Sequence, residues 1–278
     1  MKFWQTVLLL VVATVGGLTA EPVRTVKLSQ LPAALQKAVQ TQLGGGKLDE
    51  IERNEEEGKV SYTVDFTNAK GEERDFTLTE EGRLLSQEVT LEEVPPAVRN
   101  TIKGQVREGQ LDNIEKTYED SEITYEVDMT RTNGTEGSFT VGLDGKLLSV
   151  EFRLEETPAP VRKTIEATLA GGKFEGIYHL FEDSGSSYYV ELRRGGKVRD
   201  FSVAESGKLA NVQVMLSELP APVQKTITEK IDGGRIVRID KTFELRGGVL
   251  PYEVEGQKDG KPFNFSVGPR GRFLGMDE

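Results

Sequence analysis

The chain has 278 residues, with 46 acidic and 35 basic side chains, so its net charge at pH 7 is −11. A negative surface repels phosphate backbones, which argues against nucleic acid as a partner. The sequence contains no cysteine, so disulfides do not stabilise the protein and burial must do so.

The N-terminal segment has the pattern of a cleavable secretory signal. Lys2 supplies a positive charge, Thr6–Val15 is an apolar run too short to span a bilayer, and small residues precede Glu21. We therefore predict a signal peptide at residues 1–20 and a periplasmic or secreted mature protein. Loss of Lys2 brings the net charge from −11 to −12. No later segment is long and apolar enough to predict a membrane span.

The rest of the chain repeats one pattern four times. Each repeat opens with a proline, and Pro32, Pro95, Pro158 and Pro220 lie 63, 63 and 62 residues apart. An isoleucine, a tyrosine, a phenylalanine and a turn glycine then follow in the same order. These residues are Ile51, Ile114, Ile177 and Ile239; Tyr62, Tyr125, Tyr188 and Tyr252; Phe76, Phe139, Phe201 and Phe265; and Gly82, Gly145, Gly207 and Gly271. We predict tandem modules at residues 25–89, 90–152, 153–214 and 215–278.

Each repeat is predicted to begin with a helix. Proline suits the first helical turn, where its missing N–H is not needed. In the first repeat Leu31, Leu35, Val39 and Leu43 recur every four residues and form one apolar stripe. A glycine cluster at residues 44–46 then ends the helix.

Four strands are predicted after each helix. Residues 61–66 and 125–129 alternate apolar and polar side chains, which is typical of strands with one buried face. Pairs such as Asp144-Gly145 predict tight turns between the last two strands. The expected fold class is α+β, with tandem repeats of a helix followed by a four-stranded antiparallel sheet. A module of this size buries only about 60% of its extended surface, so we expect neighbouring modules to pack together.

This pattern resembles the PepSY-like family, which includes β-lactamase-inhibitor-like modules. Three motifs carry the resemblance: the Leu-Pro helix start, the Tyr-x-Val-acid strand and the Gly-basic-Leu/Phe hairpin. In the first repeat they are Leu31-Pro32, Tyr62 to Asp65 and Gly82-Arg83-Leu84. The resemblance covers nearly the whole mature chain, four times over. It implies an exported protein that binds and inhibits secreted hydrolases and has no catalytic activity. Related inhibitors tend to have one or two modules, whereas this chain has four.

The sequence shows no catalytic constellation. His179 is the only histidine and aligns with Arg53, Lys116 and Lys241, so we expect it at a surface position. The nucleophile-elbow, phosphate-loop and zinc-protease patterns are absent. We therefore predict a protein that is not an enzyme, with no catalytic residue, no cofactor and no metal.

The tip of the first hairpin in each repeat is the candidate partner-binding site. Three repeats place an aromatic ring beside charged residues there, a combination that anchors protein interfaces. The candidate contacts are Tyr118 and Asp120, Phe181 and Asp183, and Phe243 and Arg246. The alternative is a core role for these rings, since Tyr118 lies four residues after Ile114 and shares its side of the strand.

An acid also follows the strand valine in every repeat, at Asp65, Asp128, Glu191 and Glu255. Alternation places these acids on the solvent face, where basic residues of a neighbouring strand can pair with them. Two functional hypotheses follow. The first is an exported binding protein that inhibits a secreted or periplasmic hydrolase, such as a protease or a β-lactamase-like target. The second is a structural or sensory cell-envelope protein whose acids bind cations or wall polymer.

Overall fold

The computed structural model describes residues 24–277, apart from residues 57–58, 120–121, 170, 184 and 244–249. The predicted signal peptide at residues 1–20 lies outside the described residues, as do the candidate contacts Asp120 and Arg246. No described helix has both the length and the apolar character needed to cross a membrane.

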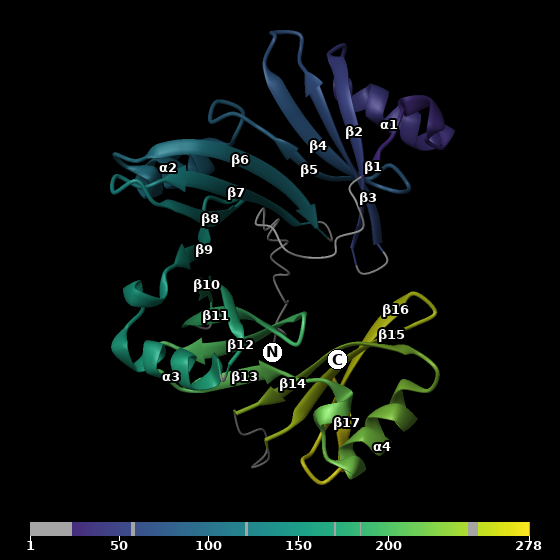
Figure 1. The fold of residues 1–278 in the computed structure, drawn as a ribbon, viewed down its shortest axis with the longest axis vertical. Helices are drawn as coiled ribbons and strands as arrows, with labels where there is room; N and C mark the ends of the chain where they lie inside the picture. Colours follow the sequence, from purple (N-terminus) through teal and green to yellow (C-terminus); the bar gives the residue numbers. More distant parts are fainter. Residues whose placement is uncertain are drawn as a thin grey trace. The chain divides into compact units, whose positions relative to one another are not determined.

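The chain divides into two compact units, which are described separately. The first unit holds the described residues up to Glu88 together with those of a later segment, Lys116–Glu122. Its elements are β1 (Arg24–Thr25), a 3-10 turn (Leu28–Gln30), α1 (Ala33–Leu43), β2 (Lys47–Glu56), β3 (Lys59–Thr67), β4 (Glu73–Thr79), β5 (Leu84–Glu88) and part of β6 (Gln110–Glu119) (Figure 1).

The second unit holds the rest of the described chain. The second repeat contributes α2 (Pro96–Val106), the start of β6, β7 (Glu122–Thr130), β8 (Glu136–Gly142) and β9 (Leu147–Phe152). The third contributes α3 (Ala159–Leu169), β10 (Lys173–Glu182), β11 (Gly185–Arg194), β12 (Lys197–Ala204) and β13 (Leu209–Gln213). The fourth contributes α4 (Ala221–Ile231), β14 (Arg235–Thr242), β15 (Tyr252–Lys258), β16 (Lys261–Val267) and β17 (Phe273–Asp277). Short 3-10 turns, Leu154–Glu156 and Leu216–Glu218, precede α3 and α4.

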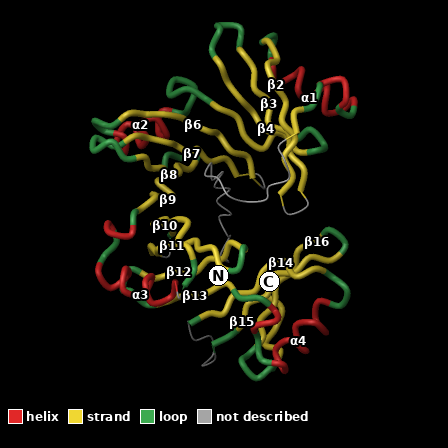
Figure 2. Tube along the Cα trace, in the orientation of Figure 1, coloured by secondary structure: helices red, strands yellow, loops and turns green. Residues whose placement is uncertain are grey.

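Helix α1 begins and ends at the proline and glycine signals predicted from the sequence. Pro32 is the N-cap of α1, and Gly44 ends the helix in the left-handed conformation with φ 53°. Leu35 and Val39 of the predicted apolar stripe are fully buried. Figure 2 shows the helices as short separate segments beside long strands.

The predicted set of separate four-stranded sheets is wrong. The seventeen strands of the described residues belong to one antiparallel sheet, accompanied by four short α-helices. The reason is visible where the repeats meet: β9 pairs with β10, and β13 pairs with β14. A sheet that ended at β9 or β13 would expose a row of unpaired N–H and C=O groups, and the first strand of the next repeat satisfies them.

Each repeat nevertheless packs its helix on its own strands. In the third repeat Val161 and Ile165 of α3 pack with Ile177, Val190 and Phe201, all fully buried. The other three repeats have equivalent clusters, centred on Phe76, Phe139 and Phe265. Strand residues that alternate with these core positions form the opposite side of the sheet, which we call the helix-free face.

A turn glycine fixes each of the last three helices to its sheet. The Thr101, Thr164 and Thr226 hydroxyls donate to the carbonyl oxygens of Gly145, Gly207 and Gly271, each at 2.6 Å. At Gly207 the φ angle is 82°, and a Cβ there would lie 2.7 Å from the Pro160 carbonyl oxygen. Only glycine allows this close approach of turn to helix.

Candidate functional site

The hairpin tip of the third repeat contains a cluster of four aromatic rings. Phe181, near the end of β10, lies 4.4 Å between ring centroids from His179. Tyr188 of β11 stacks on the imidazole at 4.5 Å, and Phe152 of β9 contacts it edge-on at 5.6 Å. Phe181 is half-buried, so this candidate anchor is also part of a packed cluster.

His179 is not the surface residue that its alignment with basic positions predicted. Its side chain is only 13% exposed, because the β9–β10 pairing places Val150 directly opposite it and brings Phe152 close. Burial lowers the pKa of His179, although the nearby Glu205 carboxylate opposes this shift. Its Nε2 lies 3.4 Å from Glu205 Oε1 without hydrogen-bond alignment. A neutral ring held among aromatics suits packing better than proton transfer.

Asp183 stands at the exposed end of the same hairpin. Its carboxylate pairs with the ammonium group of Lys146, which follows the β8–β9 turn glycine of the preceding repeat. The Asp183 side chain is almost fully exposed. It is therefore accessible, as a partner contact must be, but it already has a counter-ion.

Tyr118 and Phe243 occupy equivalent places in the second and fourth repeats. Each ring lies under the ammonium group of a lysine two residues earlier, with Lys116 Nζ 4.9 Å from the Tyr118 centroid and Lys241 Nζ 5.0 Å from that of Phe243. The Tyr118 hydroxyl accepts a hydrogen bond from Gln87 Nε2 at 3.1 Å. Phe243 is 36% exposed.

The three candidate rings stand at three separate hairpins. Tyr118 belongs to the first unit, whereas Phe181 and Phe243 belong to the second. Tyr118 and Phe243 share a local arrangement, in which a lysine and an aromatic ring two residues later lie side by side near a hairpin tip. At the third tip His179 takes the place of the lysine. The first repeat also departs from this arrangement, because Arg53 there forms an ion pair with Glu55 at 2.8 Å.

Sequence reasoning missed a buried ionic cluster on the helix-free face. Arg238 of β14 lies between two carboxylates, with Nη1 2.7 Å from Asp200 Oδ2 and Nη2 2.8 Å from Asp240 Oδ1. Asp200 is only 5% exposed. It lies on β12, two strands away from β14, so the cluster joins the third repeat to the fourth. No local motif could reveal it, since the pair is 38 residues apart in sequence.

Further carboxylates crowd the same face. Glu191 lies directly opposite Asp200 in the β11–β12 register. Burial raises the pKa of Glu191, and the Asp200 charge adds to this shift. In the first repeat burial and the Glu50 charge likewise raise the pKa of Asp65. The repeated acids are thus not simply solvated: Asp65, Glu191 and Glu255 are half-buried, and Asp128 is exposed.

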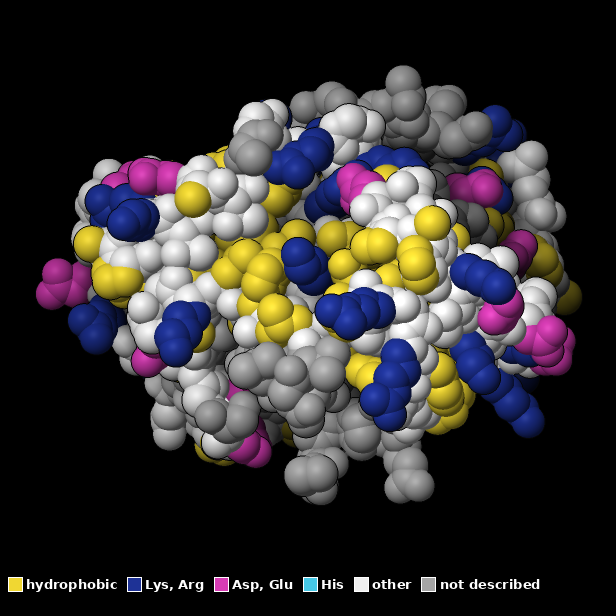
Figure 3. Space-filling model, turned by 90° about the horizontal axis from the view of Figure 1, so that it is seen from below, with side chains coloured by type: hydrophobic (Ala, Val, Ile, Leu, Met, Phe, Trp, Pro, Cys, Tyr) yellow, Lys and Arg dark blue, Asp and Glu magenta, His cyan; other side chains and the backbone are white. Residues whose placement is uncertain are grey.

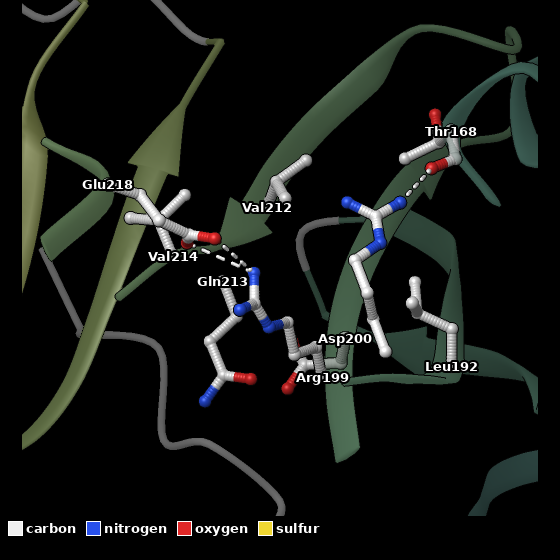
Figure 4. Close-up of a pocket in the computed structure, with 9 residues that line it drawn as sticks. Thr168, Leu192, Arg199, Asp200, Val212, Gln213, Val214 and Glu218 are labelled. Carbon is white, nitrogen blue, oxygen red and sulfur yellow. Dashed lines mark hydrogen bonds and ion pairs between the residues drawn. The ribbon is translucent and has the colours of Figure 1, made fainter. Parts of the chain in front are cut away.

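A small hollow of about 240 Å³ lies beside the C-terminal end of α3 (Figure 4). Arg194 Nη2 donates to the Leu169 carbonyl oxygen at 2.8 Å, and Arg199 Nη1 donates to Glu218 at 2.9 Å. The Nε atoms of both arginines are buried and have no acceptor among the described residues. Two fixed guanidinium groups at one hollow can bind a polar acceptor group, but acids balance their charge. In the described part of the chain, no group of three or more His, Cys, Asp or Glu side chains could hold a metal ion.

Three solved Bacteroides structures are similar to parts of the chain. A BLIP-like protein from Bacteroides fragilis is 15% identical, with 43% of this chain and 84% of that chain covered and a TM-score of 0.32. A "putative calcium-regulated periplasmic protein" from Bacteroides thetaiotaomicron is 16% identical, with 46% and 96% covered and a TM-score of 0.31. A DUF2874 family protein from Bacteroides uniformis is 20% identical, with 42% and 85% covered and a TM-score of 0.32.

No curated protein matches the chain. A family model does match it twice, at residues 20–86 and 60–149, and its description is "Putative beta-lactamase-inhibitor-like, PepSY-like". These matches contain the helix, strand and hairpin motifs of the first two repeats. Residues 20–149 of this chain are therefore similar to the PepSY-like family.

Proposed function

We propose that this protein is an exported, non-catalytic binding protein that uses its hairpin tips to engage a protein partner. The observation that carries the proposal is the recurrence of a lysine ammonium group over an aromatic ring at two tips, Lys116–Tyr118 and Lys241–Phe243. A partly exposed ring beside a fixed charge provides apolar area and polar contacts at low entropic cost. Phe243, at 36% exposure, is the most accessible of the three candidate rings.

A non-catalytic role fits the chemistry of the described residues. His179, the chain's one histidine, is packed between aromatic rings, and burial lowers its pKa. The similarity of residues 20–149 to an inhibitor-like family supports the same view. We further propose a secreted or periplasmic hydrolase as the partner and cleavage of residues 1–20 on export. The N-terminal charge and apolar run support export.

The test is capture of a partner from the secreted and envelope fractions of the source, with residues 21–278 as bait. We expect a hydrolase to co-purify and its activity to fall on binding. Phe243→Ala should weaken capture at unchanged melting temperature. Phe181→Ala should also weaken capture, with some loss of melting temperature because its ring packs on His179. Glu55→Ala is the matched control, since Glu55 holds the equivalent position in the first repeat and has no ring. Equal capture by all three variants would show that the tips are not the interface.

The acids of the helix-free face support a second candidate function, the binding of cations or wall polymer by the charge of the face as a whole, since no three acids of the described residues are placed to hold one metal ion. Asp65 and Asp75 lie directly opposite each other, and Glu50 lies opposite Asp65 on the other side. A ligand that binds only the folded state must raise its melting temperature. We expect calcium to raise the melting temperature if this function is correct. A melting curve unmoved by calcium or by chelator would contradict it and leave the binding protein as the remaining proposal.

A further inference from the structure

Strand β17 ends the antiparallel order of the second unit. It pairs with β16 on one side, and no other described strand of that unit is in register with it. Strands β9 and β13 hold the same place in their repeats, and each pairs with the first strand of the next repeat. Among the described strands of this unit, none therefore pairs with the outer edge of β17, whereas the same edge of β9 is paired with β10 and that of β13 with β14.

The side chains of β17 show the same difference. Met276 lies opposite Phe265, as Val150 lies opposite Phe139 and Val212 opposite Phe201. Both valines are half-buried and pack against the cores of their repeats. Met276 is instead 56% exposed, and Leu274 of the same strand is also exposed. Figure 3 shows that apolar side chains reach the surface between lysines and arginines on the face drawn there. Covering β17 with a strand would bury apolar area as well as pair its backbone.

The strand that occupies the equivalent position at the start of the chain is β1. The Val26 N–H donates to the Ile51 carbonyl oxygen at 2.9 Å. Val214 makes the same bond to Ile239 at the β13–β14 junction, also at 2.9 Å. On β2, then, β1 takes the place of a preceding repeat's last strand. Among the described residues, Arg24 and Thr25 of β1 are in register with β2, whereas four positions of β9 are in register with β10.

We propose that the outer edge of β17 docks strand β2 of a second copy of this chain, in a head-to-tail contact from which β1 is displaced. The partner is a second copy because β2 is the sequence equivalent of β10 and β14, the strands that the counterparts of β17 already bind. The internal junctions fix the register. Val212 lies opposite Lys241, so Met276 should lie opposite Arg53 of the second copy. In the unassembled protein, β1 covers the edge of β2 and so competes with this contact.

Engineered cysteines test the contact without interference, because the chain has no cysteine of its own. Met276→Cys combined with Arg53→Cys places thiols at the two predicted opposite positions. Opposite residues in an antiparallel pair lie about 4.5–5.5 Å apart at Cα, within the range that a disulfide spans. The pair is compared in residues 21–278 and in the same protein lacking residues 21–25. We expect disulfide-linked dimers and longer chains in both. They should form about tenfold faster without β1, the factor that corresponds to 1.4 kcal/mol of removed competition.

The positive control is Val212→Cys with Lys241→Cys, which should close a disulfide within one chain at the existing junction. Exclusively monomeric product from the Met276/Arg53 pair, under conditions where this control closes, would overturn the proposal. A disulfide between residues 53 and 276 of the same chain would also overturn it. Thr25→Pro, which disrupts β1 pairing without shortening the chain, should reproduce the effect of the deletion. By sedimentation, adding Met276→Lys to the shortened cysteine-free chain should return it from oligomer to monomer.

Discussion

The two faces of the sheet in the third and fourth repeats are stabilised differently. The face under α3 is an apolar core in which Phe201 and Ile165 are fully buried. The helix-free face buries charge, with Arg238 held between Asp200 and Asp240. Apolar packing stabilises many arrangements of similar shape, whereas a buried ion pair tolerates only the one that satisfies it. The comparison suggests that the charged face determines which strands meet, and the apolar face supplies most of the stability.

Breaking the ionic cluster should have the largest effect. We expect Arg238→Met to lower the free energy of unfolding by about 3–5 kcal/mol, because it leaves two carboxylates buried without their cation. Urea denaturation measures this change. Arg235→Met is the control, since Arg235 is an exposed residue of the same strand and its replacement should cost less than about 0.5 kcal/mol. Equal effects of the two substitutions would mean that the cluster does not hold the repeats together.

The turn glycine on the apolar face should come next. Gly207→Ala forces alanine into a positive φ and towards Pro160, so we expect a loss of about 2 kcal/mol or more. At Gly82 an added Cβ would lie 3.0 Å from the Ala38 side chain and 3.7 Å from the nearest helix backbone atoms. Gly82→Ala should therefore cost less, about 1 kcal/mol. Thermal unfolding of the two variants, compared with the parent protein, gives both values. A larger loss at Gly82 would contradict the role assigned to the helix contact.

The hydrogen bond of the same turn has a smaller expected effect. Thr164→Ala removes the hydroxyl that donates to the Gly207 carbonyl oxygen, and we expect a loss of about 1 kcal/mol. The first repeat has Ala38 at the equivalent position, so the reverse change Ala38→Thr is a natural counterpart. Denaturant titration should show destabilisation by the first substitution and none by the second if threonine fits that turn. An unchanged Thr164→Ala variant would show that the turn is held by packing alone.

Neutralising one of the crowded acids of the helix-free face should stabilise the protein, in contrast to the destabilising substitutions above, and the gain should depend on pH. Burial raises the pKa of Glu191 in the folded protein above its ordinary value of 4.5. The folded state thus holds this proton more tightly, and the resulting stability is present at low pH and lost as pH rises through the raised pKa. Glu191→Gln should therefore raise the melting temperature at pH 7, with little change near pH 4. A lower melting temperature at pH 7 would mean that the ionised carboxylate is stabilising.

The local part of the fold could be read from the sequence, and the long-range part could not. The apolar stripe through Leu35 and Val39 and the turn glycines depend on neighbours in the chain, and both lie where they were expected. The merging of strands into one sheet depends on which strand edges pair, and no local sequence motif of β9 or β10 predicts that they pair. The Asp200–Arg238 contact depends on the pairing of β13 with β14, and the burial of His179 depends on the pairing of β9 with β10. For this reason the alignment of His179 with the basic residues Arg53, Lys116 and Lys241 wrongly predicted a surface position.

The sequential order of the strands has a consequence for how the protein reaches its folded state. From β10 to β17, every strand pairs with the strand just before it in the chain. Such contacts close short loops, and topologies dominated by short loops fold faster than those that must join distant segments. A chain that emerges N-terminus first can thus add each hairpin to an edge that already exists. Ordered growth of this kind fits the export proposed above, in which the chain would fold after it has crossed a membrane unfolded.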